Sequence, residues 1–216
     1  MRMHDFVLVD VDTQFDFLDP GGDLYIPGAA RILPALERLF DFARRSQVPV
    51  ISTADEHGAR DPEFERFGRH CEAGTLGQRK LVWTVMPRSR VIRPADSLPA
   101  GPAPLLDEYQ QLIFHKADID VFVNPHLGAL VDTLLVGEYI VFGVATDFCV
   151  ATMVEGLLRR GAKVSIVADA VAAIDEARGE AMLREFETRG VELTRTAWVV
   201  HSVDLQEPAL DRWDED

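Results

Sequence analysis

The stretch "VFGVATDFCV", Val141–Val150, begins as an apolar run and ends at a cysteine. The apolar run predicts a buried strand, whereas Thr146 and Asp147 are residue types that favour the beginning of a helix. Cys149 is therefore expected where a strand turns into a helix. The chain has two cysteines in all, and one of them at such a turn makes the turn a candidate for chemistry.

Strand-like runs recur on both sides of this turn, and helical patterns separate them. Strands are expected at residues 6–12, 48–54, 111–115, 139–145, 163–168 and 191–200. Helices are expected over 32–43, from the Asn124-Pro125 cap, from Cys149 to Gly161, and over 175–189. This alternation predicts an α/β fold of three layers, in which a mainly parallel six-stranded sheet carries helices on both faces.

The chain length suits a single domain that spans residues 1–216. Two segments interrupt the alternation of strands and helices. Residues 55–85 form a long stretch rich in glycine, histidine and acidic residues, which predicts a binding loop. Residues 86–106 contain five prolines and are expected to be an insertion without regular structure.

Composition argues against several classes of function. A net charge of −14 disfavours a nucleic-acid surface, because phosphates require clustered Lys and Arg, and it provides no basic patch for an anionic membrane. The longest apolar run, residues 139–145, is too short to span a bilayer. Two cysteines are too few for a disulfide scaffold. We therefore expect a cytoplasmic protein that binds neither nucleic acid nor membranes.

Polar residues follow several of the predicted strands at the edge where ligands bind to parallel sheets. Unpaired N–H groups and the helix dipole at the start of a helix should lower the pKa of the Cys149 thiol, and Lys116 should add to this effect. The same N–H groups suit an oxyanion, and Asp12 suits a general base. The alternatives are a buried cysteine that acts as a small hydrophobe, a strand-end carboxylate and a solvated lysine.

The loop sequence "DEHGARDPEFERFGRHC" contains Asp55, His57, Glu63 and His70. Carboxylate and imidazole groups suit zinc, iron or manganese, and three protein ligands leave positions open for a substrate. The alternative is a solvated surface loop. Cys71 is interpreted as structural, because its side chain and that of the neighbouring His70 should point apart.

Five motifs together resemble the isochorismatase-like cysteine hydrolases, and within them the nicotinamidases most. In the family's order they are "VDTQFDF" (11–17), "DEH" (55–57), "RHC" (69–71), "FHK" (114–116) and "GVATDFCV" (143–150). The resemblance implies a catalytic triad of Asp12, Lys116 and Cys149. It also implies an oxyanion hole made by the backbone N–H groups of Ala145 and Cys149, and a cis peptide bond between Val144 and Ala145.

The resemblance further implies one divalent metal ion (zinc, iron or manganese) and no organic cofactor. Asp55, His57 and His70 match metal ligands of the family, and Glu63 stands where many members have a third histidine, so it is expected as a fourth ligand. Phe17 and Phe67 match positions whose rings flank the substrate; the alternative for both is a role in the core.

The implied function is the deamidation of nicotinamide to nicotinate and ammonia through a thioester at Cys149, a step of NAD salvage and pyridine nucleotide biosynthesis. Another amide or ureide hydrolase of the superfamily is the alternative, although the retained metal loop favours a nicotinamidase. Isochorismatase itself is disfavoured, because its vinyl-ether hydrolysis does not use the cysteine. A non-catalytic metal-binding or thiol redox protein is a third reading, against which the intact triad argues. The expected partners are a small amide and, since family members are often oligomers, further copies of the chain.

Overall fold

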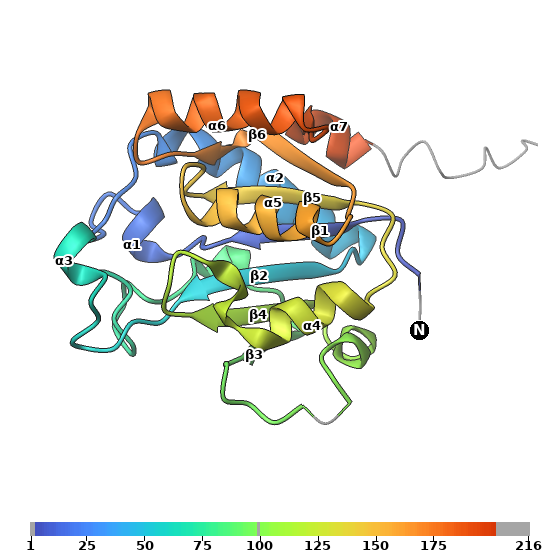
Figure 1. The fold of residues 1–216 in the computed structure, drawn as a ribbon, viewed down its shortest axis with the longest axis horizontal. Coiled ribbons are helices and arrows are strands. Elements are labelled where there is room, and N and C mark those ends of the chain that lie inside the picture. Colours follow the sequence, from blue (N-terminus) through green and yellow to red (C-terminus); the bar gives the residue numbers. More distant parts are fainter. Residues whose placement is uncertain (1–2, 99, 202–216) are drawn as a thin grey trace, which may run out of the picture.

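One parallel sheet forms the middle layer of the computed structural model, which describes residues 3–98 and 100–201 (Figure 1). Its strands lie in the order β3-β4-β2-β1-β5-β6-β7. They are β1 (Val7–Val11), β2 (Val50–Asp55), β3 (Ser89–Ile92), β4 (Gln111–Lys116), β5 (Tyr139–Val144), β6 (Val164–Ala172) and β7 (Glu192–Thr194). The helices are α1 (Phe15–Leu18), α2 (Ala29–Ser46), α3 (Phe64–Phe67), α4 (Pro125–Thr133), α5 (Cys149–Arg159), α6 (Glu176–Thr188) and α7 (Thr196–His201).

The predicted three-layer α/β class is confirmed, but the expected number of six strands is wrong, since the described residues form seven. The additional strand, β3, lies in the proline-rich segment 86–106, for which the sequence predicts no regular structure. It fits there because its four residues fall between Pro87 and Pro94, and it pairs with β4 at the edge of the sheet. Residues 103–107 of the same segment form a short 3₁₀ helix.

The predicted last strand, 191–200, is also wrong in its second half. Strand β7 ends at Thr194, and residues 196–201 form α7 instead. The cause is a tertiary contact, because the N–H and the hydroxyl of Thr196 both donate to Asp169 Oδ1, at 2.8 and 3.0 Å. A carboxylate that caps the first N–H groups favours a helix over a continued strand.

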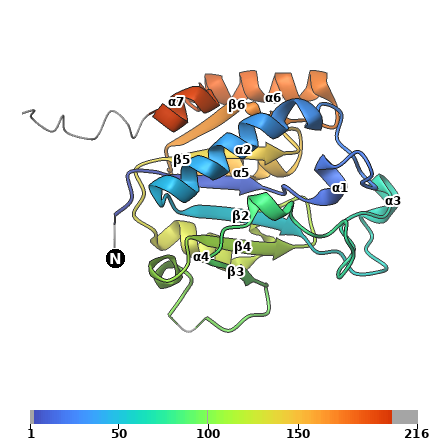
Figure 2. The same cartoon turned by 180° about the vertical axis from the view of Figure 1, so that it is seen from behind.

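Side-chain alternation along the strands gives the protein two hydrophobic cores. Val7, Val9 and Val11 of β1 belong to the same buried cluster as apolar residues of α4 and α5. Figure 1 shows these two helices on one face of the sheet. Leu8 of the same strand faces α2 on the other side, where α7 also packs (Figure 2). Residues on a strand alternate between faces, so both layers of helices cover apolar surface. Among the described residues, no helix is long and apolar enough to cross a membrane.

The carboxyl ends of the central strands β1, β2, β4 and β5 meet at one edge, and the close approach of β1 and β5 there depends on Gly143. This residue has φ +112°, a conformation that side chains rarely adopt. A Cβ atom at this position would overlap the backbone carbonyl of Val11 on the neighbouring strand. Only glycine therefore allows β5 to continue beside β1 as far as Val144.

We expect Gly143→Ala to lower the free energy of unfolding by about 3 kcal/mol or more, because backbone strain and overlap with Val11 add together. Gly190 provides the matched control, since its φ is also positive (+88°) but a Cβ atom at this position would have no neighbour within 4 Å. Gly190→Ala should cost only about 1 kcal/mol. Urea unfolding of the two variants measures the difference, and equal losses would contradict the role given to Gly143.

Candidate active site

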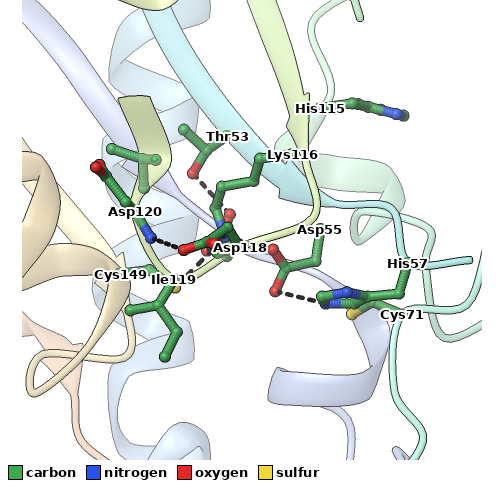
Figure 3. A network of polar contacts seen from close by, with 12 residues as sticks. Thr53, Asp55, His57, Cys71, His115, Lys116, Asp118, Ile119, Asp120 and Cys149 are labelled. Atoms are coloured by element: carbon green, nitrogen blue, oxygen red, sulfur yellow. Dashed lines mark hydrogen bonds and ion pairs between the residues drawn. The ribbon is translucent and has the colours of Figure 1, made fainter. Parts of the chain in front are cut away.

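Lys116, at the end of β4, is the centre of a buried polar cluster at this edge of the sheet (Figure 3). Its Nζ lies 3.0 Å from Asp12 Oδ2, in ion-pair contact with Asp55 Oδ1, and 3.4 Å from Cys149 Sγ. It also donates to the carbonyl of Asp118 at 3.1 Å. The three residues expected as a triad, Asp12, Lys116 and Cys149, are thus brought together from three different strand ends.

Burial and mutual charge decide the protonation of this cluster. Burial alone would lower the pKa of Lys116, but Asp12 and Asp55 raise it well above its usual value, so the ammonium stays charged. Burial raises the pKa of Asp12, although Lys116 opposes the effect. Burial also raises the pKa of Cys149 well above its usual value, against the opposing effect of Lys116. The expected lowering of the thiol pKa is therefore wrong, because removal from water outweighs the effect of the nearby cation.

Beside the thiol, two backbone N–H groups have no hydrogen-bond acceptor in the part of the chain that the structure describes. Cys149 is the first residue of α5, so its N–H has no partner within the helix. Among the described residues, neither this N–H nor that of Ala145 donates to a carbonyl, whereas the Ala145 carbonyl accepts from Phe148 and Val150. The Val144–Ala145 peptide bond is cis, as the resemblance implied. A pair of free N–H groups next to a nucleophile can hold a developing oxyanion.

The histidines of the loop between β2 and β3 are arranged as metal ligands are. His57 Nδ1 lies 3.1 Å from Asp61 Oδ2, and His70 Nδ1 contacts the carbonyl of Gly68 at 2.9 Å. An oxygen partner on one ring nitrogen leaves the other free for a metal, which is the common pattern of metal-binding histidines. His57 Nε2 lies 3.7 Å from Asp55 Oδ2; neither ring nitrogen of His57 makes a hydrogen bond to a described residue, so the contact of Nδ1 with Asp61 is an ion pair.

The donor atoms of Asp55, His57 and His70 all lie within 4.8 Å of one another and are buried. Ligands of one zinc ion lie roughly 3–4 Å apart, so small side-chain movements let the three share an ion. Burial alone would lower the pKa of His57, but Asp55 and Asp61 raise it to about 9. Surroundings that stabilise a positive imidazolium also favour a metal cation, so these residues fit a divalent ion.

Glu63 is placed differently from the other three candidate ligands. Its Oε1 lies 3.7 Å from His70 Nε2, and its side chain lines a cavity at the edge of the cluster. Burial, together with Asp55, raises its pKa. Glu63 is therefore the most exposed of the four candidate ligands, and it lies beside His70 at the cavity.

The cavity connects the thiol with the histidine group. It has about 340 Å³ of empty volume including its mouth, and its polar lining consists of Asp12, Asp55, Glu63, His70 and Cys149. The rest of its lining is apolar and includes Phe17 and Phe67, the two aromatic residues expected near a substrate ring. The ring of Phe67 packs on that of Phe148 at 5.2 Å between centroids. Apolar and aromatic walls with a few polar groups among them suit a small, flat ligand.

The structure gives a positioning role to three residues, of which only Gln14, in the motif "VDTQFDF", was part of the resemblance, where it had no role of its own. Gln14 exchanges two hydrogen bonds with the backbone of Asp55, at 2.6 and 2.8 Å, and holds its main chain in place. Asp61 orients His57. The hydroxyl of Thr53 donates to Asp12 Oδ1 at 2.6 Å. For Thr53 the sequence contained one indication of a role in the site: it lies two residues before Asp55, so the two side chains share a face of the strand.

Comparisons with known proteins agree with this architecture. Among curated proteins, the chain is 29% identical to the nicotinamidase of Escherichia coli (strain K12) over 182 residues, which cover 75% of this chain and 80% of that protein. It is 24% identical over 173 residues to a probable inactive nicotinamidase of Arabidopsis thaliana, covering 80% and 83%. The crystal structure of the pyrazinamidase of Pyrococcus horikoshii in complex with zinc has a TM-score of 0.69 and 24% identity, covering 88% of this chain and 99% of that chain. Because the family model described as "Isochorismatase domain" matches residues 6–197, from the residue before β1 into α7, the protein belongs to the isochorismatase family.

Proposed function

We propose that the protein is a cysteine amidohydrolase that converts nicotinamide to nicotinate and ammonia. The observation that supports this most strongly is one cavity whose lining includes both Cys149 and Asp12 and both His70 and Glu63. A thiol beside a carboxylate suits attack on an amide carbonyl. A cation site in the same cavity suits a substrate whose ring carries a basic nitrogen, as the pyridine ring of nicotinamide does.

In the first half of the reaction, Asp12 takes the proton of the Cys149 thiol and Sγ attacks the amide carbonyl. The backbone N–H groups of Ala145 and Cys149 donate to the oxyanion of the tetrahedral intermediate. Asp12 then returns the proton to the leaving nitrogen, and ammonia departs from a thioester. A carboxylate of raised pKa is a better proton acceptor than an ordinary one, which suits Asp12 to this exchange.

In the second half, Asp12 deprotonates a water molecule that attacks the thioester. The same two N–H groups hold the second oxyanion, and its collapse breaks the C–S bond. Asp12 then returns the proton taken from water to Sγ, which restores the thiol, and the released acid loses its proton to solvent and becomes nicotinate. Lys116 remains charged throughout, because Asp12 and Asp55 raise its pKa, and it limits the repulsion between Asp12 and the thiolate.

The residues that would hold a divalent ion are Asp55, His57, His70 and, from the cavity side, Glu63. When bound, such an ion supplies a Lewis-acid contact for the pyridine nitrogen. The side chains of the cavity contribute by orienting the substrate. Phe17 and Phe67, which line the cavity, confine the ring, so that the ring nitrogen is directed to the histidine group and the amide to Cys149.

Ammonia release from nicotinamide by the metal-loaded protein tests the proposed function. We expect Cys149→Ala to reduce turnover on the order of 10⁴-fold or more, because it removes the nucleophile. Cys71→Ala is the matched control, since Cys71 is the other buried cysteine and does not line the cavity. Near wild-type turnover by Cys149→Ala would refute a thioester at this residue.

We expect the purified protein to contain one divalent ion per chain, measured by inductively coupled plasma mass spectrometry. Asp61→Asn should weaken metal affinity roughly 10- to 100-fold, because Asp61 orients His57 without contacting the ion itself. Asp120→Asn serves as control, since its carboxylate accepts from the N–H of Phe122 away from the histidines. A protein that binds no divalent ion even when one is supplied would rule out this metal site.

The role of the cation site in substrate recognition is tested with two amides of similar shape. Benzamide lacks the ring nitrogen of nicotinamide. We expect His57→Ala to raise KM for nicotinamide at least about 10-fold more than for benzamide, because only the former loses a contact. Steady-state kinetics of the wild type and the variant with both amides measure this difference in KM. Equal effects on both would mean that the histidines have a structural role and would leave a general cysteine amidohydrolase.

A further inference from the structure

Two buried arrangements of a carboxylate, a hydroxyl and an ammonium group lie side by side at the ends of β1 and β2: one contains Asp12, the residue after β1, and the other contains Asp10 of β1. In the first, Asp12 pairs with Lys116 and accepts from the hydroxyl of Thr53. In the second, Asp10 pairs with Lys80 at 2.8 Å and accepts from the hydroxyl of Ser52 at 2.8 Å. Ser52 and Thr53 are adjacent on one strand, so their side chains point to opposite faces of the sheet.

The two carboxylates differ in which oxygen their donors use. Ser52 and Lys80 both contact Asp10 Oδ2, and Asp10 Oδ1 has no hydrogen-bond partner among the described residues. On Asp12 the donors are divided, because Thr53 donates to Oδ1 while Lys116 lies near Oδ2. Asp12 Oδ2 accepts no hydrogen bond from a described residue, although Lys116 Nζ is 3.0 Å away as its ion-pair partner.

The direction of the Asp12 carboxylate matters because the thiol lies beside it. Oxygen atoms of Asp12 and Asp55 and the sulfur of Cys149 all lie within 4.8 Å of one another. A carboxylate can rotate about its terminal bond, whose preferences are broad, and Lys116 alone would attract either oxygen. The Thr53 hydroxyl donates to Oδ1 at 2.6 Å. Oδ2, on the Lys116 side of the carboxylate, is thereby left without a hydrogen-bond donor among the described residues and can accept a proton.

We propose that Thr53 is a positioning residue for the reaction: its hydroxyl fixes the Asp12 carboxylate so that Oδ2 meets the proton of the Cys149 thiol. The inference rests on the proposed function, because it concerns the same proton transfer. The thiol proton moves from Sγ to Oδ2 and later to the leaving nitrogen, while the Thr53 proton stays on its own oxygen throughout. Thr53 acts through Asp12 and does not line the cavity, so it has no contact with substrate.

Three substitutions separate this role from a merely structural one. Thr53→Val keeps the shape of the side chain and removes the hydroxyl, and Thr53→Ser keeps the hydroxyl. Ser52→Ala is the control, because it also removes a buried hydroxyl that donates to a carboxylate, that of Asp10, and neither residue lines the cavity. The Ser52 hydroxyl accepts in addition from Gln111 Nε2, so this substitution tests the loss of stability at least as strictly. All are assayed in the metal-loaded protein, with kcat and KM for nicotinamide, metal content and Tm measured for each.

We expect Thr53→Val to lower kcat roughly 10- to 100-fold, the range for the loss of one hydrogen bond to a charged group, and to leave KM and metal content within about 2-fold. Thr53→Ser should restore kcat to within about 3-fold of the wild type. Ser52→Ala should lower Tm as Thr53→Val does, yet keep kcat. If Thr53→Val does not fold, Thr53→Ala replaces it with the same expectation.

The outcomes distinguish this inference from the proposed function. A wild-type protein that hydrolyses nicotinamide, together with unchanged kcat in Thr53→Val, overturns the role of Thr53 alone. Equal losses of kcat in Thr53→Val and Ser52→Ala overturn it too, since both would then act through stability. A wild-type protein that releases no ammonia from nicotinamide refutes the proposed function itself, and the inference about Thr53 is refuted with it.

Discussion

The site depends on one buried ammonium group held between two carboxylates. Lys116 is removed from water, which would be unfavourable for an isolated charge, and its contacts with Asp12 and Asp55 offset that cost. The three side chains come from β4, β2 and the end of β1, so the ion pairs also hold the ends of three strands in register. Without the ammonium, two carboxylates would be buried side by side, and one would have to take up a proton.

Asp55 connects the cluster around Lys116 and Cys149 with the histidines of the candidate metal site. One of its oxygens contacts Lys116, and the other lies 3.7 Å from His57 Nε2. Its pKa is lowered to about 2 because Lys116 and His57 outweigh the effect of burial, so it remains charged. A charged carboxylate between the lysine and the histidines places the cation site beside the thiol. Gln14 holds the backbone of Asp55 in this position through two hydrogen bonds.

Much of the fold follows from local patterns in the sequence. Apolar runs and caps are local signals, and they located β1, β2, β4, β5 and the beginnings of α4, α5 and α6. Helix α4 begins where Asn124 accepts from the N–H of His126, as its Asn-Pro dipeptide predicted. The wrongly predicted elements are those whose secondary structure depends on contacts with residues far away in the sequence. Asp169 converts residues 196–201 into a helix, and pairing with β4 makes a strand of β3 between two prolines.

By itself, the sequence determined which chemical groups are present and, through strand order, that Asp12, Lys116 and Cys149 follow strands whose ends meet. These properties are encoded by residue type and periodicity, which act over a few positions along the chain. Only the tertiary structure decided how those groups behave. Burial raises the pKa of the Cys149 thiol although the residue begins a helix beside a lysine. Thr53 and Asp61 gain their roles from contacts with Asp12 and His57, and such contacts, like loss of water, are properties of the folded environment.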